Sequence, residues 1–258
     1  MSRLDHSPRA GAAPVARMLR AQTVMELRLT LRRGESLLLT MVIPIVLLAF
    51  FASVDLLETG ADDPLDFLVP GVLALAVMST SMTGLAIATG FERSYGVLKR
   101  LGASPLPRGV LLTAKTLGVL VVESLQTVLL CGVGLALGWR PSGGVRAAGA
   151  TVVLVLLGTA CFCGIGLLMA GTLRAEATLA AANGLYLVLL LLGGVLFPLS
   201  QLPGPLRAVG EVLPTAALSD GLRAALADSG SLSARPVAVL AVWAVVSLGL
   251  ASVTFRWE

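Results

Sequence analysis

The chain has 258 residues, of which 56% are hydrophobic and 13% are charged, and it carries a formal net charge of +4. A soluble domain carries about 25% charged residues because it needs a solvated surface, so this composition excludes an ordinary water-soluble fold. The single histidine, His6, also excludes a histidine-based metal site or catalytic triad built from this chain alone. We expect an all-α, polytopic membrane protein with no catalytic residue and no metal site.

The N-terminal segment is rich in arginine: Arg3, Arg9, Arg17, Arg20, Arg28, Arg32 and Arg33 precede the first long apolar stretch. On a helix with about 100° between residues, positions 17–33 present two apolar faces. We expect an interfacial helix that lies on membrane lipids and also touches protein, after a flexible cytoplasmic tail over residues 1–16. The alternative is an irregular basic tail held by lipid charge. Nucleic acid is not an expected partner, because the segment has no aromatic residues for base stacking.

Six apolar stretches are each long enough to cross a hydrocarbon core of about 30 Å as a helix. They are residues 37–57, 67–89, 110–137, 145–173, 178–199 and 236–255. Together with the N-terminal helix, these spans define one transmembrane domain over residues 17–258.

The charges of the first two loops set the expected orientation. The first loop carries Asp55, Glu58, Asp62, Asp63 and Asp66 and no basic residue, whereas the second carries Arg93, Lys99, Arg100 and Arg108. Basic residues that flank spans stay on the cytoplasmic side. We therefore expect a multi-pass protein of the inner (plasma) membrane with both termini in the cytoplasm.

The second loop also predicts a short helix over residues 94–101. Val97, Leu98 and Leu101 would form its apolar edge, and Gly102 and Pro105 would end it. A helix of this length is marginal alone, so a cytoplasmic partner with a groove would complete it. The alternative is an ordinary positively charged loop.

Polar residues inside the spans suggest a pathway. An ionised Glu123 facing lipid would cost about 2.5–3.5 kcal/mol, so it should face protein or water. Thr116 and Thr127 share its helical arc, and Gln126 lies about 60° away. Two interpretations are open. Either this stripe lies on a substrate pathway or dimer seam, or Glu123 is protonated and its carboxyl group is hydrogen-bonded to a neighbouring helix. Asn183 in the fifth span either bonds across helices or touches substrate.

Between residue 198 and the last span, Pro198, Pro203, Pro205 and Pro214 interrupt the apolar residues too often for another crossing. Short outer helices or a re-entrant hairpin are expected there.

Several of these segments match one family pattern. They are Phe67-Leu68-Val69-Pro70-Gly71, Glu92-Arg93-x-x-Gly96, Ser104-Pro105-Leu106, Lys115, Phe197-Pro198, Pro203, Leu213-Pro214 and Leu222-Arg223. The identity and order of these segments along the chain resemble those of the ABC-2 type membrane subunits of ATP-driven transporters, particularly the daunorubicin-resistance-like drug-exporter permeases of bacteria.

The resemblance implies a coupling helix that rests on a separate nucleotide-binding ATPase. Its residues would be Glu92, Arg93, Gly96, Val97, Leu98, Lys99, Arg100 and Leu101, with a second contact at Arg174. This chain has no Gly-x-x-x-x-Gly-Lys-Ser/Thr loop, so ATP and Mg are expected on the partner and no cofactor on this chain.

The resemblance also implies that two copies, as a homodimer, export a hydrophobic or amphipathic small molecule, drug or lipid, and so give antibiotic resistance. The alternative function is an ATP-independent secondary transporter or channel. That class would favour internal repeats and several intramembrane charges.

Overall fold

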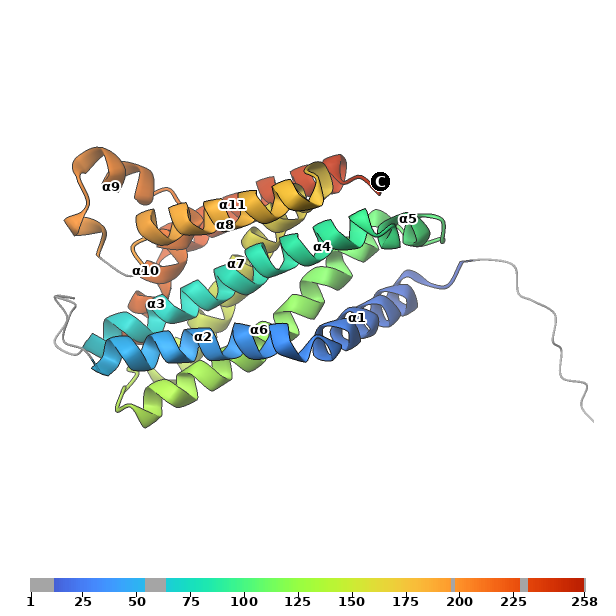
Figure 1. Ribbon diagram of the computed structural model, residues 1–258. Coiled ribbons are helices and arrows are strands. Elements are labelled where there is room, and N and C mark those ends of the chain that lie inside the picture. The colour runs from blue at the N-terminus through green and yellow to red at the C-terminus, as the bar shows by residue number, and fades with distance from the viewer. Residues whose placement is uncertain (1–11, 54–63, 196–197, 228–231, 258) are drawn as a thin grey trace, which may run out of the picture.

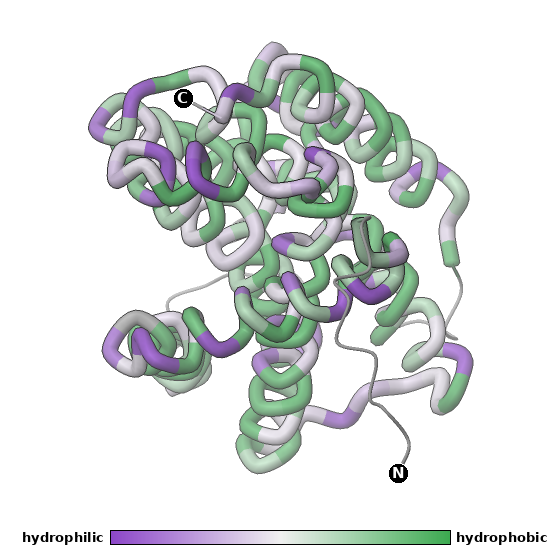
Figure 2. Tube along the Cα trace, turned by 90° about the vertical axis from the view of Figure 1, so that its right-hand side faces the viewer, coloured by the Kyte–Doolittle hydropathy of each residue, from purple (hydrophilic) through white to green (hydrophobic). Residues whose placement is uncertain are grey.

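The computed structural model describes residues 12–53, 64–195, 198–227 and 232–257. Within these ranges the chain forms helices and contains no strand, which confirms the predicted all-α fold. The long helices form an elongated bundle (Figure 1). Seen from one end of the bundle, their traces are predominantly hydrophobic (Figure 2). The expected tail over residues 1–16 lies outside the described residues as far as residue 11.

The first half of the chain contains a long rod between two pairs of helices. Its elements are α1 (Val15–Arg32), α2 (Gly34–Ser53), α3 (Pro64–Met78), the π-helical turn η1 (Ser79–Gly84), α4 (Leu85–Ser94), α5 (Val97–Gly102) and α6 (Arg108–Ala136). The rod consists of α3, η1 and α4, which follow one another without a break. A helical α1 is the expected N-terminal helix, so the irregular-tail alternative is wrong for residues 15–32.

The second half contains three long helices and a group of short ones. Its elements are α7 (Gly144–Thr172), α8 (Ala175–Leu192), the 3-10 turn η2 (Leu199–Gln201), α9 (Gly204–Gly210), α10 (Pro214–Ala227) and α11 (Ala234–Thr254). The short elements η2, α9 and α10 occupy the region where short outer helices were expected.

Five helices are long and apolar enough to cross a membrane: Pro64–Ser94, Arg108–Ala136, Gly144–Thr172, Ala175–Leu192 and Ala234–Thr254. The pair Val15–Arg32 and Leu37–Ser53 passes the same criterion jointly and is bent by 69° at the break between its members. Counting this pair as one span gives the six predicted from the sequence. The chain is therefore a multi-pass membrane protein.

Two helices end at other residues than the apolar stretches predicted as spans. The helix of the second stretch continues beyond residue 89 to Ser94, because the polar residues near its end find partners in the protein. The helix of the fifth stretch ends at Leu192, before residue 199, and Gly194 beyond it adopts a left-handed φ of +64° that few other residues tolerate. Residues 54–57 and 196–197, at the ends of the first and fifth expected spans, lie outside the described residues.

The two ends of the bundle carry different elements (Figure 1). At one end lie α5, the start of α1 and the C-terminal end of α11, and we call it the α5 end. At the other lie α9, α10 and the start of α3, and we call it the α9 end. Both described ends of the chain thus lie on the same side of the bundle.

The main core surrounds α3, in which every residue from Phe67 to Met78 is buried. Side chains from α7 and α10, such as Phe162 and Leu218, pack against it. Gly166 of α7 permits a close approach to the rod, because a Cβ there would lie 2.7 Å from the carbonyl oxygen of Met82 in η1. Such small residues allow membrane helices to touch through their backbones.

A second core lies at the α5 end, and we call it the α5-end apolar cluster. Its buried members are Leu85, Leu98, Leu111, Leu112, Cys163, Leu167, Ala251 and Phe255. These residues come from α4, α5, α6, α7, α11 and the segment after α11, so this cluster joins most elements of that end.

Candidate functional site

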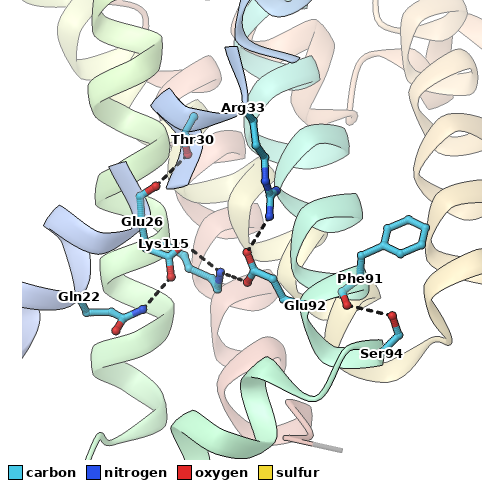
Figure 3. Close-up of polar contacts among 8 residues, drawn as sticks. All are labelled: Gln22, Glu26, Thr30, Arg33, Phe91, Glu92, Ser94 and Lys115. Carbon is cyan, nitrogen blue, oxygen red and sulfur yellow. Dashed lines mark hydrogen bonds and ion pairs between the residues drawn. The ribbon is translucent and has the colours of Figure 1, made fainter. Parts of the chain in front are cut away.

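A buried lysine joins three helices at the α5 end (Figure 3). The side chain of Lys115, in the second turn of α6, is only 1% exposed. Its Nζ lies 2.6 Å from Oε2 of Glu92 on α4 and 3.1 Å from Oε2 of Glu26 on α1. A buried charge is stable only when it is paired and hydrogen-bonded. Lys115 therefore depends on both carboxylates, and both depend on it.

Two further residues occupy the remaining carboxylate oxygens. Gln22 donates from Nε2 to Oε1 of Glu26 at 2.8 Å, and Arg33 places Nη2 3.7 Å from Oε1 of Glu92. Arg33 is half exposed, so its ion pair is screened and contributes less than that of Lys115. The four charged residues, Glu26, Arg33, Glu92 and Lys115, sum to zero charge. We call them the Lys115 cluster.

Local sequence explains how these side chains meet. Gln22 and Glu26 are four residues apart on α1 and share one face of the helix. That face rests on α6 at Gly118, where a Cβ would lie 3.3 Å from Cβ of Glu26. A larger residue at 118 would push α1 away from Lys115.

Arg93, next to Glu92, makes a second connection. Its Nη2 donates to the carbonyl oxygen of Leu173, in the turn between α7 and α8. The last carbonyl groups of a helix lack partners within it, and a basic side chain satisfies them well. Adjacent residues of α4 thus bind α1 and α6 on one side and the α7–α8 turn on the other.

The expected coupling helix is shorter than predicted. It begins at Val97 instead of 94, because Gly96 takes a left-handed φ of +72° and reverses the chain. Glu92 and Arg93 consequently belong to α4, and their expected part in coupling to an ATPase stays a prediction.

The apolar edge predicted to meet a partner is mostly turned inward. Leu98 is fully buried and Leu101 packs beside it on the α5-end apolar cluster. The outward face consists instead of Val97, Lys99 and Arg100 of α5, together with the exposed Tyr95 in the turn before it. This face is the part of α5 that another protein can reach.

Arg174, the expected second contact, lies close to this region. It precedes the first residue of α8 and is exposed. The preceding residue, Leu173, accepts the bond from Arg93. Arg174 therefore follows directly after the residue that binds Arg93 at the end of α4.

The polar stripe of the third span lies inside the chain. Glu123 is 1% exposed and accepts a hydrogen bond from Thr159 of α7. Gln126 is equally buried, donates to the carbonyl oxygen of Thr40 at 2.8 Å and accepts from Thr80 at 3.1 Å. These two side chains hold α6 against α7, α2 and η1. Thr159 binds one carboxyl oxygen of Glu123, whereas the other, Oε1, is buried without a hydrogen-bond partner among the described residues.

The other expected pathway residues are more accessible. Thr116 is half-buried and donates to the carbonyl oxygen of Leu112, and Thr127 is half-buried as well. Asn183 is exposed on α8 and donates to the carbonyl oxygen of Leu179 at 2.9 Å. The five residues are thus not brought together into one site.

A small cavity of about 120 Å³ lies where α2, α3, η1 and α8 meet. Its lining residues are Leu39, Thr40, Ile43, Pro44, Leu75, Ser79 and Tyr186. Gln126 lies behind this wall, because its amide binds the carbonyl group of Thr40. Periodicity could not locate this cavity, since its residues come from three separate spans.

At the α9 end, Arg223 of α10 fastens α10 to α3. Its guanidinium lies 3.7 Å from the ring centroid of Phe67 and donates to the carbonyl oxygen of Val195 and to Asp220, each at 3.1 Å. Burial lowers the pKa of Arg223 to about 10 and raises that of Asp220. Arg223, whose side chain is 16% exposed, thus connects α10 to α3 and to the segment after α8.

Sequence reasoning recognised Lys115 only as a motif residue and gave it no partner. The available signal was a lysine inside an apolar stretch, which must find a counter-charge. Glu26 was not singled out, although it is the one acidic residue on the inward face of α1.

The chain belongs to the ABC-2 type transporter family, whose pattern matches residues 19–227. It is thus a membrane permease of an ABC transporter, a class of transport subunit that works with an ABC ATPase subunit. All four residues of the Lys115 cluster fall within the matched range, whereas α11 lies beyond it.

Two curated relatives are similar over large parts of the chain. "Putative transport permease YvfS" of Bacillus subtilis (strain 168) is 27% identical over 209 residues, which cover 77% of this chain and 81% of that protein. "Probable doxorubicin resistance ABC transporter permease protein DrrC" of Mycobacterium tuberculosis is 31% identical over 137 residues, which cover 50% of this chain and 49% of that protein.

Proposed function

We propose that this chain is the membrane-spanning subunit of an ATP-driven exporter. Two copies would form the substrate pathway, and a separate nucleotide-binding ATPase, which holds ATP and Mg, would drive it. The observation that carries this proposal is the arrangement of α5, whose inner face is buried while Tyr95, Val97, Lys99 and Arg100 face outward beside the Lys115 cluster. Such a face suits an ATPase surface that offers acidic and apolar groups.

In this proposal the α5 end lies in the cytoplasm. It carries the arginine-rich α1 and the basic residues from 93 to 108, which the positive-inside rule retains on that side. Both chain termini then lie in the cytoplasm of a cell whose inner membrane holds the protein. The exposed apolar residues of α1, Val24, Met25 and Leu31, would rest on membrane lipids.

The connections at the α5 end suggest how ATPase motion spreads. A push on α5 reaches α4 through the turn at Gly96. Because Glu92 is bonded to Lys115, a shift of α4 also pulls on α6 and α1. Arg93 transmits the same shift to the α7–α8 turn. The pathway would thus change its access side as α4 moves.

The pathway itself would run beside α2 and α8. The cavity there combines apolar side chains with the hydroxyl groups of Thr40, Ser79 and Tyr186. Such a lining suits a hydrophobic or amphipathic small molecule, drug or lipid. The printed name of the relative DrrC, which refers to doxorubicin resistance, supports a drug. Gln126 and Glu123 would support the wall, with Thr116 and Thr127 on the same helix.

Asn183 supports the expected dimer. A polar side chain exposed on a membrane-spanning helix is costly in lipid, so it should face protein or water in the assembly. We place it at the seam with a second copy or in the pathway between the copies.

The test uses this chain co-expressed with a candidate ABC ATPase. We expect co-purification, and ATP-dependent uptake of a fluorescent amphipathic drug into inverted vesicles. Reversing the charge of Arg100 should weaken co-purification at least tenfold, whereas the same change at Arg207, exposed on α9, should not. Full transport by the purified chain in ATP-free vesicles with only an ion gradient would overturn the proposal.

A further inference from the structure

The segment after α11 places an aromatic pair against α5. Phe255 is buried, and its ring lies edge to face with that of Trp257, with centroids 6.1 Å apart and an interplanar angle of 88°. Trp257 covers Gly102, the last residue of α5, where a Cβ would lie 3.0 Å from Cδ2 of the indole ring. The end of the chain therefore touches the element that we propose as the ATPase contact.

The same segment is fastened to α7. A Cβ on Gly171 would lie 2.8 Å from Cδ2 of Phe255, so only a glycine allows this approach. The backbone N–H of Arg256 donates to the carbonyl oxygen of Gly171 at 3.3 Å. Two glycines, one on α5 and one on α7, thus lie against two successive aromatic rings.

The short α5 needs such support. A helix of six residues is not stable alone, so the packing around it sets its orientation. Leu98 and Leu101 pack on the α5-end apolar cluster together with Leu111 of α6 and Phe255. Trp257 packs on the same cluster from outside. The C-terminal segment and α6 therefore hold the inner face of α5.

We propose that Phe255 and Trp257 form a C-terminal latch that positions α5 against α7 and α11. A push on α5 then reaches α7 and α11 directly, in addition to the path through α4. Trp257 is a positioning residue, since it acts through α5. The coupling part of this inference rests on the proposed function, whereas the latch itself does not.

The first experiment tests the latch on the purified full-length chain in nanodiscs, without an ATPase. Hydrogen exchange of the amides of residues 97–103 is followed by mass spectrometry. Trp257→Ala should speed this exchange roughly tenfold, because an edge-to-face aromatic pair contributes beyond its buried area. Trp257→Phe should restore most of the protection. Trp243→Ala is the matched change on α11, where the indole donates to the carbonyl oxygen of Val212 between α9 and α10, and it should leave these amides unchanged.

A double-mutant cycle tests the contact itself. Gly102→Leu should speed exchange of α5, because the new side chain collides with the indole ring. The same substitution in the Trp257→Ala background should have a much smaller effect, since the space is then empty. Equal effects of Gly102→Leu in both backgrounds, or unchanged exchange in Trp257→Ala, would overturn the latch.

The second experiment adds the ATPase and measures drug-stimulated ATP hydrolysis. Trp257→Ala should reduce the stimulation at least fivefold while co-purification persists, and Trp257→Phe should recover it. Normal stimulation in Trp257→Ala despite fast exchange of α5 would overturn the positioning role. Absence of stimulation in the unmodified protein would instead contradict the proposed function, while the exchange data still decide the latch.

Discussion

Nζ of Lys115 lies 2.6 Å from Oε2 of Glu92, so the start of the third span and the end of the second share one buried ion pair. Glu26 binds the same ammonium group from α1. Removal of the lysine would leave two carboxylates close together with only Arg33 and Gln22 to compensate.

We predict that Lys115→Met destabilises the protein by about 3–5 kcal/mol, because it leaves buried charges unpaired. Thermal unfolding of the detergent-solubilised protein measures the loss. The change Arg100→Met on the exposed face of α5 should have little effect on unfolding.

A triple variant separates charge from shape. Combining Lys115→Met with Glu26→Gln and Glu92→Gln removes all the buried charge at this point and should recover most of the stability. If the triple variant were as unstable as Lys115→Met alone, the ion pairs would not be the cause.

Gly96→Ala should raise the free energy of the turn between α4 and α5 by about 1–3 kcal/mol, because alanine rarely adopts the left-handed φ of +72° found there. The strain falls on the connection between α4 and α5. We therefore expect weaker stimulation of the ATPase with normal membrane insertion. Gly96→Asn should be closer to the original protein, since asparagine tolerates this conformation better. Equal activity of the alanine and asparagine variants would contradict the explanation.

Glu123→Gln should leave folding and export nearly unchanged. Glutamine keeps an oxygen that accepts the hydrogen bond from Thr159. Glu123→Leu should destabilise the protein by about 1–3 kcal/mol, because it removes the buried hydrogen bond between α6 and α7. Export measured in vesicles and thermal unfolding of the two variants together test whether Glu123 has a structural role. A large loss of export by Glu123→Gln with normal unfolding would return Glu123 to the substrate pathway.

Arg223→Met should weaken the contact between α10 and α3. It removes the contacts to Phe67, Asp220 and the carbonyl oxygen of Val195, and we expect a loss of about 2–4 kcal/mol. Arg223→Lys should lose less, because the charge over the Phe67 ring is kept. Denaturant titration of both variants measures the difference. Similar losses for the two would mean that geometry matters more than charge.

Glu211 gives a pH dependence at the α9 end. Hydrogen bonds from Arg235 and Arg207 lower the pKa of its carboxyl group below 4.5. A lowered pKa stabilises the folded state above the unfolded value and loses this effect as the pH falls. We expect the protection of the α9 amides, relative to the intrinsic exchange rate at each pH, to fall below pH 4.5, and Glu211→Gln to remove this loss of protection. A loss of protection that persists in Glu211→Gln would assign the effect to another group.

The sequence predicted the elements that depend on local pattern. Five of the six apolar stretches form helices that are each long and apolar enough to cross a membrane, and the first passes this criterion only jointly with α1. Gly102 ended the short helix as expected. Its start at Val97 was missed, because a glycine at position 96 gives no local sign that it will adopt a positive φ.

The contacts between distant residues could not be predicted in the same way. Periodicity placed Glu123, Thr116 and Thr127 on one arc but could not tell whether that arc faces α7, a second copy or an open pathway. The partners of Lys115 are 89 and 23 residues away along the chain. Only the three-dimensional packing of α1, α4 and α6 brings them together.

The unbroken rod from Pro64 to Ser94 has 31 residues. At a rise of about 1.5 Å per residue it is roughly 46 Å long, whereas the hydrocarbon core is about 30 Å thick. Part of the rod must therefore project beyond the acyl chains. A projection on the side of Glu92 would hold α5 at the level of the lipid headgroups or above it, so a bound ATPase would work at a distance from the bilayer without deforming it.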